Sequence, residues 1–111
     1  MQRGDIFYAN LDSTQGSEIQ KTRPVVIVSN DAANRAAALV TVLPVTSNVS
    51  RIFPFEVKLL AAQTGLSKDS KAMAQQVRTL DKSRLSAARA GHVQADLMLQ
   101  IDAALRLHLG L

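Results

Sequence analysis

The chain has 111 residues, of which 47% are apolar and 20% charged, a composition typical of one folded domain spanning residues 1–111. It contains no cysteine, which excludes disulfide bonds, thiolate metal sites and a cysteine nucleophile. A formal charge of +4 and an isoelectric point near 10.0 favour an anionic partner, such as nucleic acid or an acidic protein. No signal segment and no apolar run of about 20 residues is evident, so we expect a cytoplasmic protein without a membrane partner.

The first part of the chain predicts two strands joined by a long polar loop. Residues 6–11 have the alternation of a strand, and residues 12–22 are polar and contain a glycine. Residues 24–29 form an uninterrupted β-branched run, which suits a strand buried on both faces. Arg23 comes where the loop meets this strand, so we expect its cation to be held by the scaffold and still open to a ligand.

The middle of the chain predicts two more strands. A turn or short helical connection over residues 30–38 leads into a β-branched strand at 39–45, in which Pro44 indicates an edge or a termination point. After a polar loop, residues 53–59 alternate between apolar and polar side chains, as a half-buried strand does. One face would carry Phe53, Phe55, Val57 and Leu59, and the other Glu56 and Lys58.

The last third of the chain predicts a helical end. Residues 71–80 are ambiguous, because their alanines, glutamines and methionine favour a helix while alternate positions could line one face of a strand. Asp81 would cap a short helix over residues 82–85. Residues 94–109 are the clearest helix, with an apolar face and charges that suit the helix dipole. Short strands with one closing helix indicate an α+β domain, mostly β, built as a small barrel.

The chain carries a series of short motifs in a fixed order. They are Arg3-Gly4-Asp5, Gly16-Ser17-Glu18, Arg23-Pro24-Val25-Val26, Ser29-Asn30-Asp31, Asn34, Pro44-Val45-Thr46, the run over residues 76–85, and Ile101-Asp102-Ala103-Ala104-Leu105. In this order and at this spacing, covering nearly the whole chain, they resemble the MazF/PemK family of toxins. The resemblance also favours a strand for residues 71–80.

The resemblance implies an SH3-like barrel of the CcdB/PemK type with a C-terminal helix, usually a homodimer. It implies a ribosome-independent, sequence-selective endoribonuclease that cleaves single-stranded RNA, including mRNA, and so inhibits translation and growth. Cleavage would need no metal or other cofactor and would leave a 2′,3′-cyclic phosphate and a 5′-hydroxyl. A MazE-like antitoxin would bind the same groove, in a heterohexamer with the toxin, until the antitoxin is degraded.

By the same resemblance, Arg23 and Thr46 fall on the family's catalytic arginine and threonine. Glu18 falls on the acidic residue of the family's substrate loop, and Gln76 falls near the active groove. An acidic residue often precedes that glutamine in the family, whereas this chain has Gln75, which leaves the electrostatics and the sequence preference of the groove open. The expected RNA-binding residues are Ser17, Glu18, Lys21, Gln76 and Arg78.

RNA cleavage of this kind must remove a proton from the 2′-hydroxyl, stabilise a charged phosphorane and protonate the leaving 5′-oxygen. Histidine usually moves such protons, but His92 and His108 lie far from the loop junction in sequence, and we expect surface or packing roles for both. Arg23 stays protonated, so it suits binding the phosphate and neutralising its charge better than acting as a base. Thr46 could donate its hydroxyl to the same phosphate. Which group moves each proton stays open.

Two groups of side chains have both a structural and a functional interpretation. The basic residues Arg78, Lys82, Arg84 and Arg89 could be a solvated face, or could contact phosphate or a second subunit. The aromatic residues Tyr8, Phe53 and Phe55 could stack on bases, but their alternating positions favour the core.

Other functions stay open at this point. A non-enzymatic toxin of the same fold could poison DNA gyrase, as CcdB does, and a divergent member could bind RNA or antitoxin without cutting. The pair Arg23 and Thr46 favours the nuclease, since a gyrase poison has no need of it. The acidic residues are scattered and no glycine-rich phosphate loop follows a strand, which argues against a metal-dependent nuclease.

Overall fold

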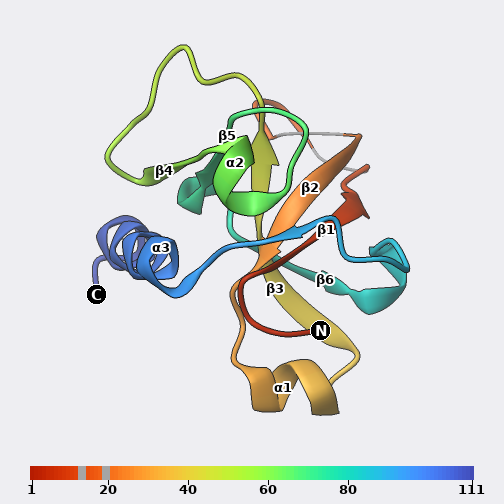
Figure 1. The fold of residues 1–111 in the computed structure, drawn as a ribbon. Coiled ribbons are helices and arrows are strands. Elements are labelled where there is room, and N and C mark those ends of the chain that lie inside the picture. Colours follow the sequence, from red (N-terminus) through yellow and green to blue (C-terminus); the bar gives the residue numbers. More distant parts are fainter. Residues whose placement is uncertain (13–14, 19–20) are drawn as a thin grey trace.

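The computed structural model describes residues 1–12, 15–18 and 21–111, which form a bent antiparallel sheet with a helix across it (Figure 1). The strands are β1 (Asp5–Asn10), β2 (Thr22–Ile27), β3 (Leu39–Thr46), β4 (Glu56–Leu59), β5 (Ser70–Met73), β6 (Arg78–Asp81) and β7 (Gly91–His92). The helices are α1 (Asp31–Ala36), α2 (Ala61–Thr64) and α3 (Ala95–Leu109), and two 3₁₀ turns are η1 (Ala74–Gln76) and η2 (Lys82–Arg84). None of the described helices is both long and apolar enough to cross a lipid bilayer.

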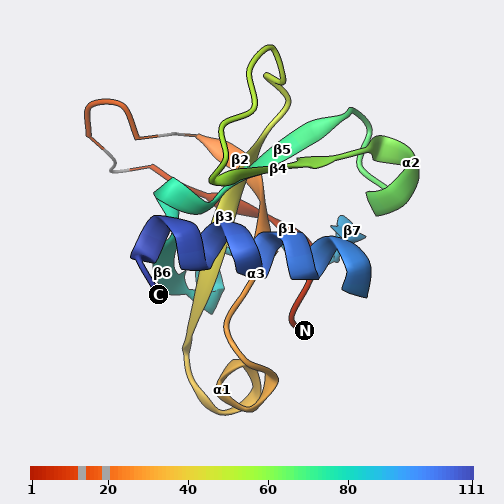
Figure 2. The same ribbon diagram turned by 90° about the vertical axis from the view of Figure 1, so that its left-hand side faces the viewer.

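The sheet bends because one strand has two partners on the same side. The hydrogen-bonded order is β4-β5-β3-β2-β1-β7, and β6 pairs with β3 outside this path. The start of β3 pairs with β6 and its end pairs with β5, so the sheet curls along β3 into a half-open barrel. Helix α3 lies across the inside of the curl (Figure 2). The predicted α+β, mostly β barrel with a C-terminal helix is therefore confirmed.

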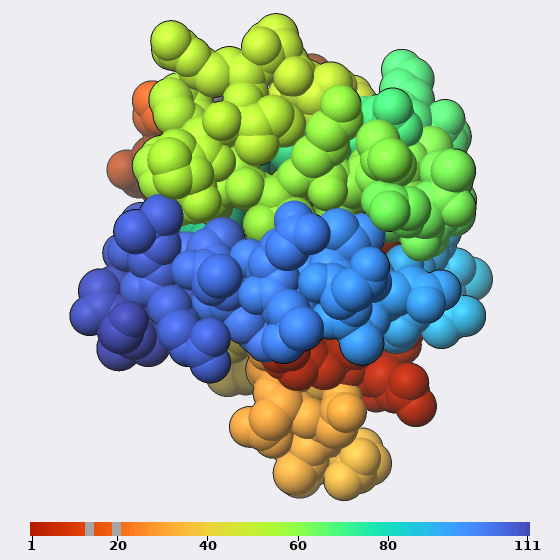
Figure 3. Space-filling view, turned by 60° about the vertical axis from the view of Figure 1, so that its left-hand side comes forward, coloured from red at the N-terminus to blue at the C-terminus, as the bar shows by residue number. Residues whose placement is uncertain are grey.

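Both faces of the sheet are buried, each in its own core. On one face Ile6 and Val26 pack beneath α3 against Ile101, and all three side chains are 0% exposed. Figure 3 shows α3 lying along this side of the molecule, below the yellow-green segment that leads to β4. On the other face Phe7 and Val25 belong to a second, smaller core. The prediction of a strand buried on both faces is confirmed. Its bounds differ from the predicted 24–29, because β2 begins at Thr22 and ends at Ile27.

The prediction that Pro44 marks an edge or an end was wrong. β3 is the central strand of the sheet and continues through Pro44 to Thr46. Its pairing with β6 reaches Val42 and its pairing with β5 begins at Val45, so on this side of β3 Pro44 lies in the gap between the two partners, while on the other side it is paired with Val25 of β2. A proline has no N–H to give to a ladder, and a gap between two partners accommodates it as an edge would.

The prediction for residues 53–59 was also wrong in part. β4 begins at Glu56, so both phenylalanines precede it, and Phe53 is 39% exposed. The two rings stack on each other at 5.5 Å instead of entering the core. Glu56 is buried, because it has a cationic partner that alternation alone does not show. Tyr8 is 41% exposed, so the core assignment fails for it as well.

Residues 71–80 form two strands rather than one. β5 ends at Met73, the chain turns through η1, and β6 begins at Arg78. The strand favoured by the family resemblance is thus correct at both ends and interrupted in the middle. The other predictions nearby are close to the structure. The side chain of Asp81 accepts a 2.8 Å hydrogen bond from the N–H of Ser83 at the start of η2, and α3 begins at Ala95 and ends at Leu109.

Candidate active site

The two predicted catalytic residues lie on neighbouring strands at the same end of the sheet. Val25 of β2 is paired with Pro44 of β3. Extending this antiparallel register by two residues toward the β1–β2 loop sets Arg23 opposite Thr46. Residues directly opposite each other in antiparallel strands project from the same face. Both side chains are partly exposed, so they present a guanidinium and a hydroxyl from neighbouring strands.

Thr46 is held at the point where β3 ends. Its Oγ1 accepts a 3.2 Å hydrogen bond from the N–H of Asn48, and Asn48 in turn accepts from the N–H and the hydroxyl of Ser50. These local bonds fix the turn that follows the strand. The hydroxyl proton of Thr46 takes no part in the bond to Asn48, so the hydroxyl can donate to a ligand.

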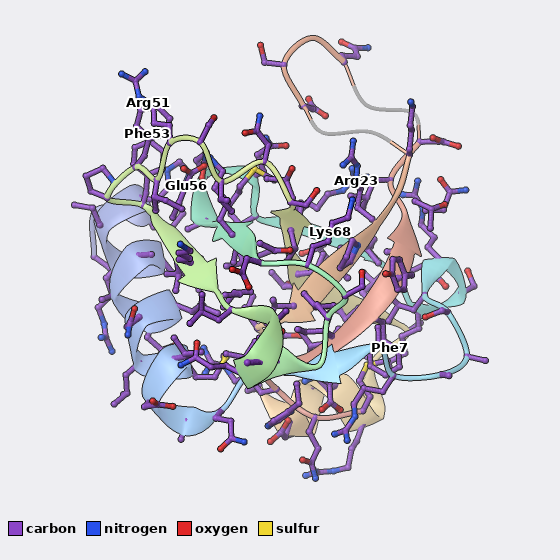
Figure 4. All side chains as sticks on the ribbon, turned by 45° about the horizontal axis from the view of Figure 1, so that its top comes forward. Phe7, Arg23, Arg51, Phe53, Glu56 and Lys68 are labelled. Atoms are coloured by element: carbon purple, nitrogen blue, oxygen red, sulfur yellow. The ribbon has the colours of Figure 1, made fainter. Side chains whose placement is uncertain are left out.

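A pocket of about 220 Å³ opens beside Arg23, and we call it the Lys68 pocket. Arg23 and Lys68 are its two cations, and Figure 4 shows them next to each other near the start of β2. Three serines also line it, Ser47, Ser67 and Ser70. Cations combined with hydroxyl groups are typical ligands of phosphate. Lys68 escaped the sequence analysis because it stands 45 residues after Arg23 and resembled an ordinary turn residue.

A second pocket, of about 300 Å³, brings together other predicted RNA-binding residues. We call it the Glu18 pocket. Its lining joins Glu18 from the β1–β2 loop to Gln75, Gln76, Val77 and Arg78, which run from η1 into β6. Its polar groups therefore include a carboxylate, two amides and a guanidinium, which together can donate to and accept from base edges and phosphate.

Three predicted site residues line neither pocket. Thr46 lies between Val45 and Ser47, which do line the Lys68 pocket. Ser17 and Lys21 are exposed in the β1–β2 loop. Lys21 has a φ of 70°, and its carbonyl accepts a 3.1 Å bond from the N–H of Leu11, which closes the base of the loop. RNA contact by Ser17 and Lys21 stays a prediction.

A buried ion pair supports the wall of the Glu18 pocket. Nζ of Lys71 lies 2.9 Å from Oε1 of Glu56 and also donates to the carbonyl of Arg51. Oε2 of Glu56 accepts a 2.7 Å bond from Nε2 of Gln75. Burial raises the pKa of Glu56, but hydrogen bonds from Lys71, the Phe53 N–H and Gln75 outweigh it and hold that pKa below its ordinary value. Figure 4 shows Glu56 beneath the loop that carries Arg51 and Phe53.

Gln75, where the sequence departs from the pattern of the family it resembles, belongs to this cluster. Because a carboxylate oxygen can only accept, the bond to Glu56 fixes which end of the Gln75 amide is the NH₂ group. Oε1 of Gln75 is buried, and among the described residues it has no hydrogen-bond partner. The amide therefore acts here as a donor to Glu56.

Both histidines contact groups outside the two pockets. Nδ1 of His92 lies 2.9 Å from Oδ1 of Asp5, and His108 packs against the ring of Phe55 at 6.4 Å. Three of the four basic residues of the sequence run have different surroundings. Arg89 pairs with Asp5 at 3.1 Å and Arg84 donates to a backbone carbonyl, whereas Arg78 lines the Glu18 pocket. No three His, Asp or Glu side chains of the described chain gather as metal ligands would.

The curled sheet and the helix that closes it are shared with a class of toxins. The profile of the PemK-like, MazF-like toxins of type II toxin–antitoxin systems matches residues 2–109, and the chain belongs to this family. The sequence is 46% identical over 116 residues to Endoribonuclease MazF9 of Mycobacterium tuberculosis (strain ATCC 25618 / H37Rv), covering 100% of this chain and 98% of that protein.

Solved structures agree with this assignment. MazF from Deinococcus radiodurans superimposes with a TM-score of 0.85 at 29% identity, over 100% of this chain and 97% of that one. A mycobacterial endoribonuclease in complex with its cognate antitoxin gives a TM-score of 0.81 at 28% identity, over 100% and 96% of the two chains. The resemblance that the sequence motifs carry, and the barrel fold it implies, are therefore confirmed.

Proposed function

We propose that the chain is the toxin of a type II toxin–antitoxin system and acts as a metal-independent endoribonuclease on single-stranded RNA, including mRNA. The observation that carries the proposal is the pairing of Val25 of β2 with Pro44 of β3, a register that sets Arg23 opposite Thr46 when it is extended by two residues. The relative that is 46% identical is named an endoribonuclease, which supports the same activity here. The formal charge of +4 suits a polyanionic substrate.

The chemistry proposed is transesterification within the RNA strand. A bond forms between the 2′-oxygen and the adjacent phosphorus, and the bond from phosphorus to the 5′-oxygen breaks. The 2′-hydroxyl loses a proton and the 5′-oxygen gains one, so the products are a 2′,3′-cyclic phosphate and a 5′-hydroxyl. No water is consumed, and sequence selectivity comes from the groups that hold the neighbouring nucleotides.

The protein's main contribution is to stabilise charge. The phosphorane carries more negative charge on its non-bridging oxygens than the ground state does, and a guanidinium that donates to them lowers the barrier. Arg23 supplies this cation from a paired strand, which keeps it oriented. Thr46 donates its hydroxyl to the same phosphate. Because His92 and His108 are engaged elsewhere, charge stabilisation and orientation supply much of the rate enhancement.

The proposal includes protein partners. A MazE-like antitoxin would inhibit the toxin, and two toxin chains would form a homodimer that joins the antitoxin in a heterohexamer. A related endoribonuclease has been solved with its cognate antitoxin, which supports such a partner here. The outer side of α3 exposes Leu99, Leu107 and Leu109, which offer an apolar surface to a second chain. The basic charge favours an acidic antitoxin segment.

The experiment compares the wild-type protein with Arg23→Ala on several long single-stranded RNAs in EDTA. We expect discrete cuts by the wild type and none by Arg23→Ala at the same circular dichroism spectrum. Arg35→Ala, which removes an exposed arginine on α1 at the opposite end of the molecule, is the matched control and should cut normally. Intact RNA combined with inhibition of DNA gyrase supercoiling would favour the gyrase poison instead.

A further inference from the structure

The Lys68 pocket is lined by both polar and apolar residues, and the proposed catalysis uses only Arg23 among them. Tyr8 and Pro24 are directly paired across β1 and β2, so their side chains project from one face. Val45 and Leu66 continue this apolar wall. Arg23, Lys68 and the serines described above complete the lining. Such a lining suits a nucleotide, which combines a charged phosphate with flat and apolar ring surfaces.

Lys68 has the properties of a phosphate ligand. It is exposed at the mouth of the pocket, and its ammonium pairs with no acidic side chain of the described residues. The neighbouring Asp69 is engaged elsewhere, because its carboxylate accepts a 2.8 Å bond from the N–H of Ala61 at the start of α2. The charge of Lys68 is thus not neutralised locally and can attract an anion.

Tyr8 is far more exposed than its neighbours in the same strand. The residue is 41% exposed, while Phe7 and Ala9 on either side of it are 7% and 1% exposed. A tyrosine beside a basic pocket suits stacking or edge contact with a base or ribose, as in single-strand binders. The core assignment predicted from alternation fails here because the Lys68 pocket opens over this ring.

The pocket is too small for a whole ligand. Its volume of about 220 Å³ lies below the roughly 300–1,000 Å³ of sites that enclose complete small molecules. It suits one unit of a longer strand that continues outside. Arg23 lines this pocket and is also a proposed catalytic residue, so the unit held here is next to the phosphate that is cut.

We infer that the Lys68 pocket is a subsite for a nucleotide adjacent to the cleavage point. Lys68 binds the phosphate of that nucleotide, and Tyr8 packs against its base or ribose. The inference rests on the proposed nuclease function, since it concerns how the same RNA strand is held. Both residues are binding residues outside the bond-breaking step, and they act on substrate affinity.

The experiment measures binding of a 2′-O-methyl RNA oligonucleotide, which cannot be cut, as a function of salt. We expect Lys68→Ala to weaken binding about fivefold to tenfold and to reduce the slope of log affinity against log salt by about 0.7, the loss of one phosphate contact. Lys68→Arg should restore both quantities. Tyr8→Ala should weaken binding by a similar factor without changing the slope, and Tyr8→Phe should keep most of the wild-type affinity. Lys58→Ala, at an exposed lysine on β4, is the matched control and should leave affinity and slope unchanged.

Cleavage kinetics separate this inference from the proposed function. With Lys68→Ala we expect KM to rise by the factor seen in binding and kcat to be retained, because a neighbouring contact is the same in the ground state and the transition state. A wild-type protein that cuts RNA, with Lys68→Ala equal to it in affinity, slope and KM, would overturn the subsite alone. A fall in kcat at constant KM would instead place Lys68 on the scissile phosphate. A wild-type protein that neither binds nor cuts RNA would overturn both proposals.

Discussion

Lys71 forms a 2.9 Å ion pair with Glu56, and the same lysine is the strand partner of Thr46. Replacing Lys71 by methionine keeps the aliphatic stem but leaves the Glu56 carboxylate buried without its cation. We expect a loss of about 3 kcal/mol in the free energy of unfolding. Chemical denaturation measures it, and Lys58→Met, at the exposed lysine paired with Lys71 on β4, should stay within about 0.5 kcal/mol of the wild type. Equal losses in the two variants would contradict a special role for the ion pair.

The same carboxylate makes stability depend on pH. The pKa of Glu56 in the folded protein lies below its ordinary value of 4.5. Its contribution is therefore fully present above about pH 4.5 and is lost as the pH falls through the folded-state pKa. The pKa of Asp5 is also lowered, because hydrogen bonds from Gln2, His92 and Arg89 outweigh the effect of burial, which raises it. The free energy of unfolding, measured by denaturation between pH 7 and pH 3, should fall less steeply with decreasing pH for Glu56→Gln than for the wild type. An unchanged slope would exclude Glu56 as a source of the acid sensitivity.

Introducing an acidic residue at position 75 should create a coupled carboxylate pair. In Gln75→Glu the NH₂ group that donates to Glu56 at 2.7 Å is replaced by an oxygen. Two carboxylates at that separation repel each other, so one of them takes up a proton at a pH above its ordinary range. We expect the variant to be roughly 1–3 kcal/mol less stable than the wild type at pH 7 and to recover part of the loss at pH 5. A variant equally stable at both pH values would show that the side chain turns away from Glu56.

Thr46 should contribute less to the rate than Arg23. Removing one donor to a charged transition state typically costs a factor of about 10² in kcat. We expect Thr46→Ala to reach this loss, Thr46→Ser to retain most of the rate, and both to fold normally. Single-turnover cleavage of a labelled RNA measures the rates. If Thr46→Ala cut at the wild-type rate, Thr46 would have no part in the chemical step.

The strands and the final helix could be predicted because their signals are local. The β-branched run after Arg23 and the apolar stripe of α3 each specify their element without reference to the rest of the chain. The positions that failed depend on distant partners. Glu56 is buried because of Lys71, and Pro44 lies inside a central strand because β5 and β6 leave a gap beside it. No pattern within one segment carries that information.

The residues of the candidate site likewise divide into those that sequence motifs predict and those whose proximity depends on the fold. Arg23 and Thr46 follow from motifs that resemble a known family, and the register of β2 and β3 is consistent with them. Lys68 could not be predicted, since its proximity to Arg23 arises only when the segment after α2 folds back over the end of the β1–β2 hairpin. Tyr8 was assigned to the core because alternation does not reveal where a barrel is left open.

The central claim is tested most directly by the chemistry of the RNA ends. Products of the purified protein in EDTA would be mapped by ligation assays and mass spectrometry, beside those of Arg23→Ala and Arg35→Ala. The account predicts discrete cuts with 2′,3′-cyclic phosphate and 5′-hydroxyl ends for the wild type and Arg35→Ala, and intact RNA for Arg23→Ala. Cuts that bear 5′-phosphates, or that persist in Arg23→Ala, would contradict it.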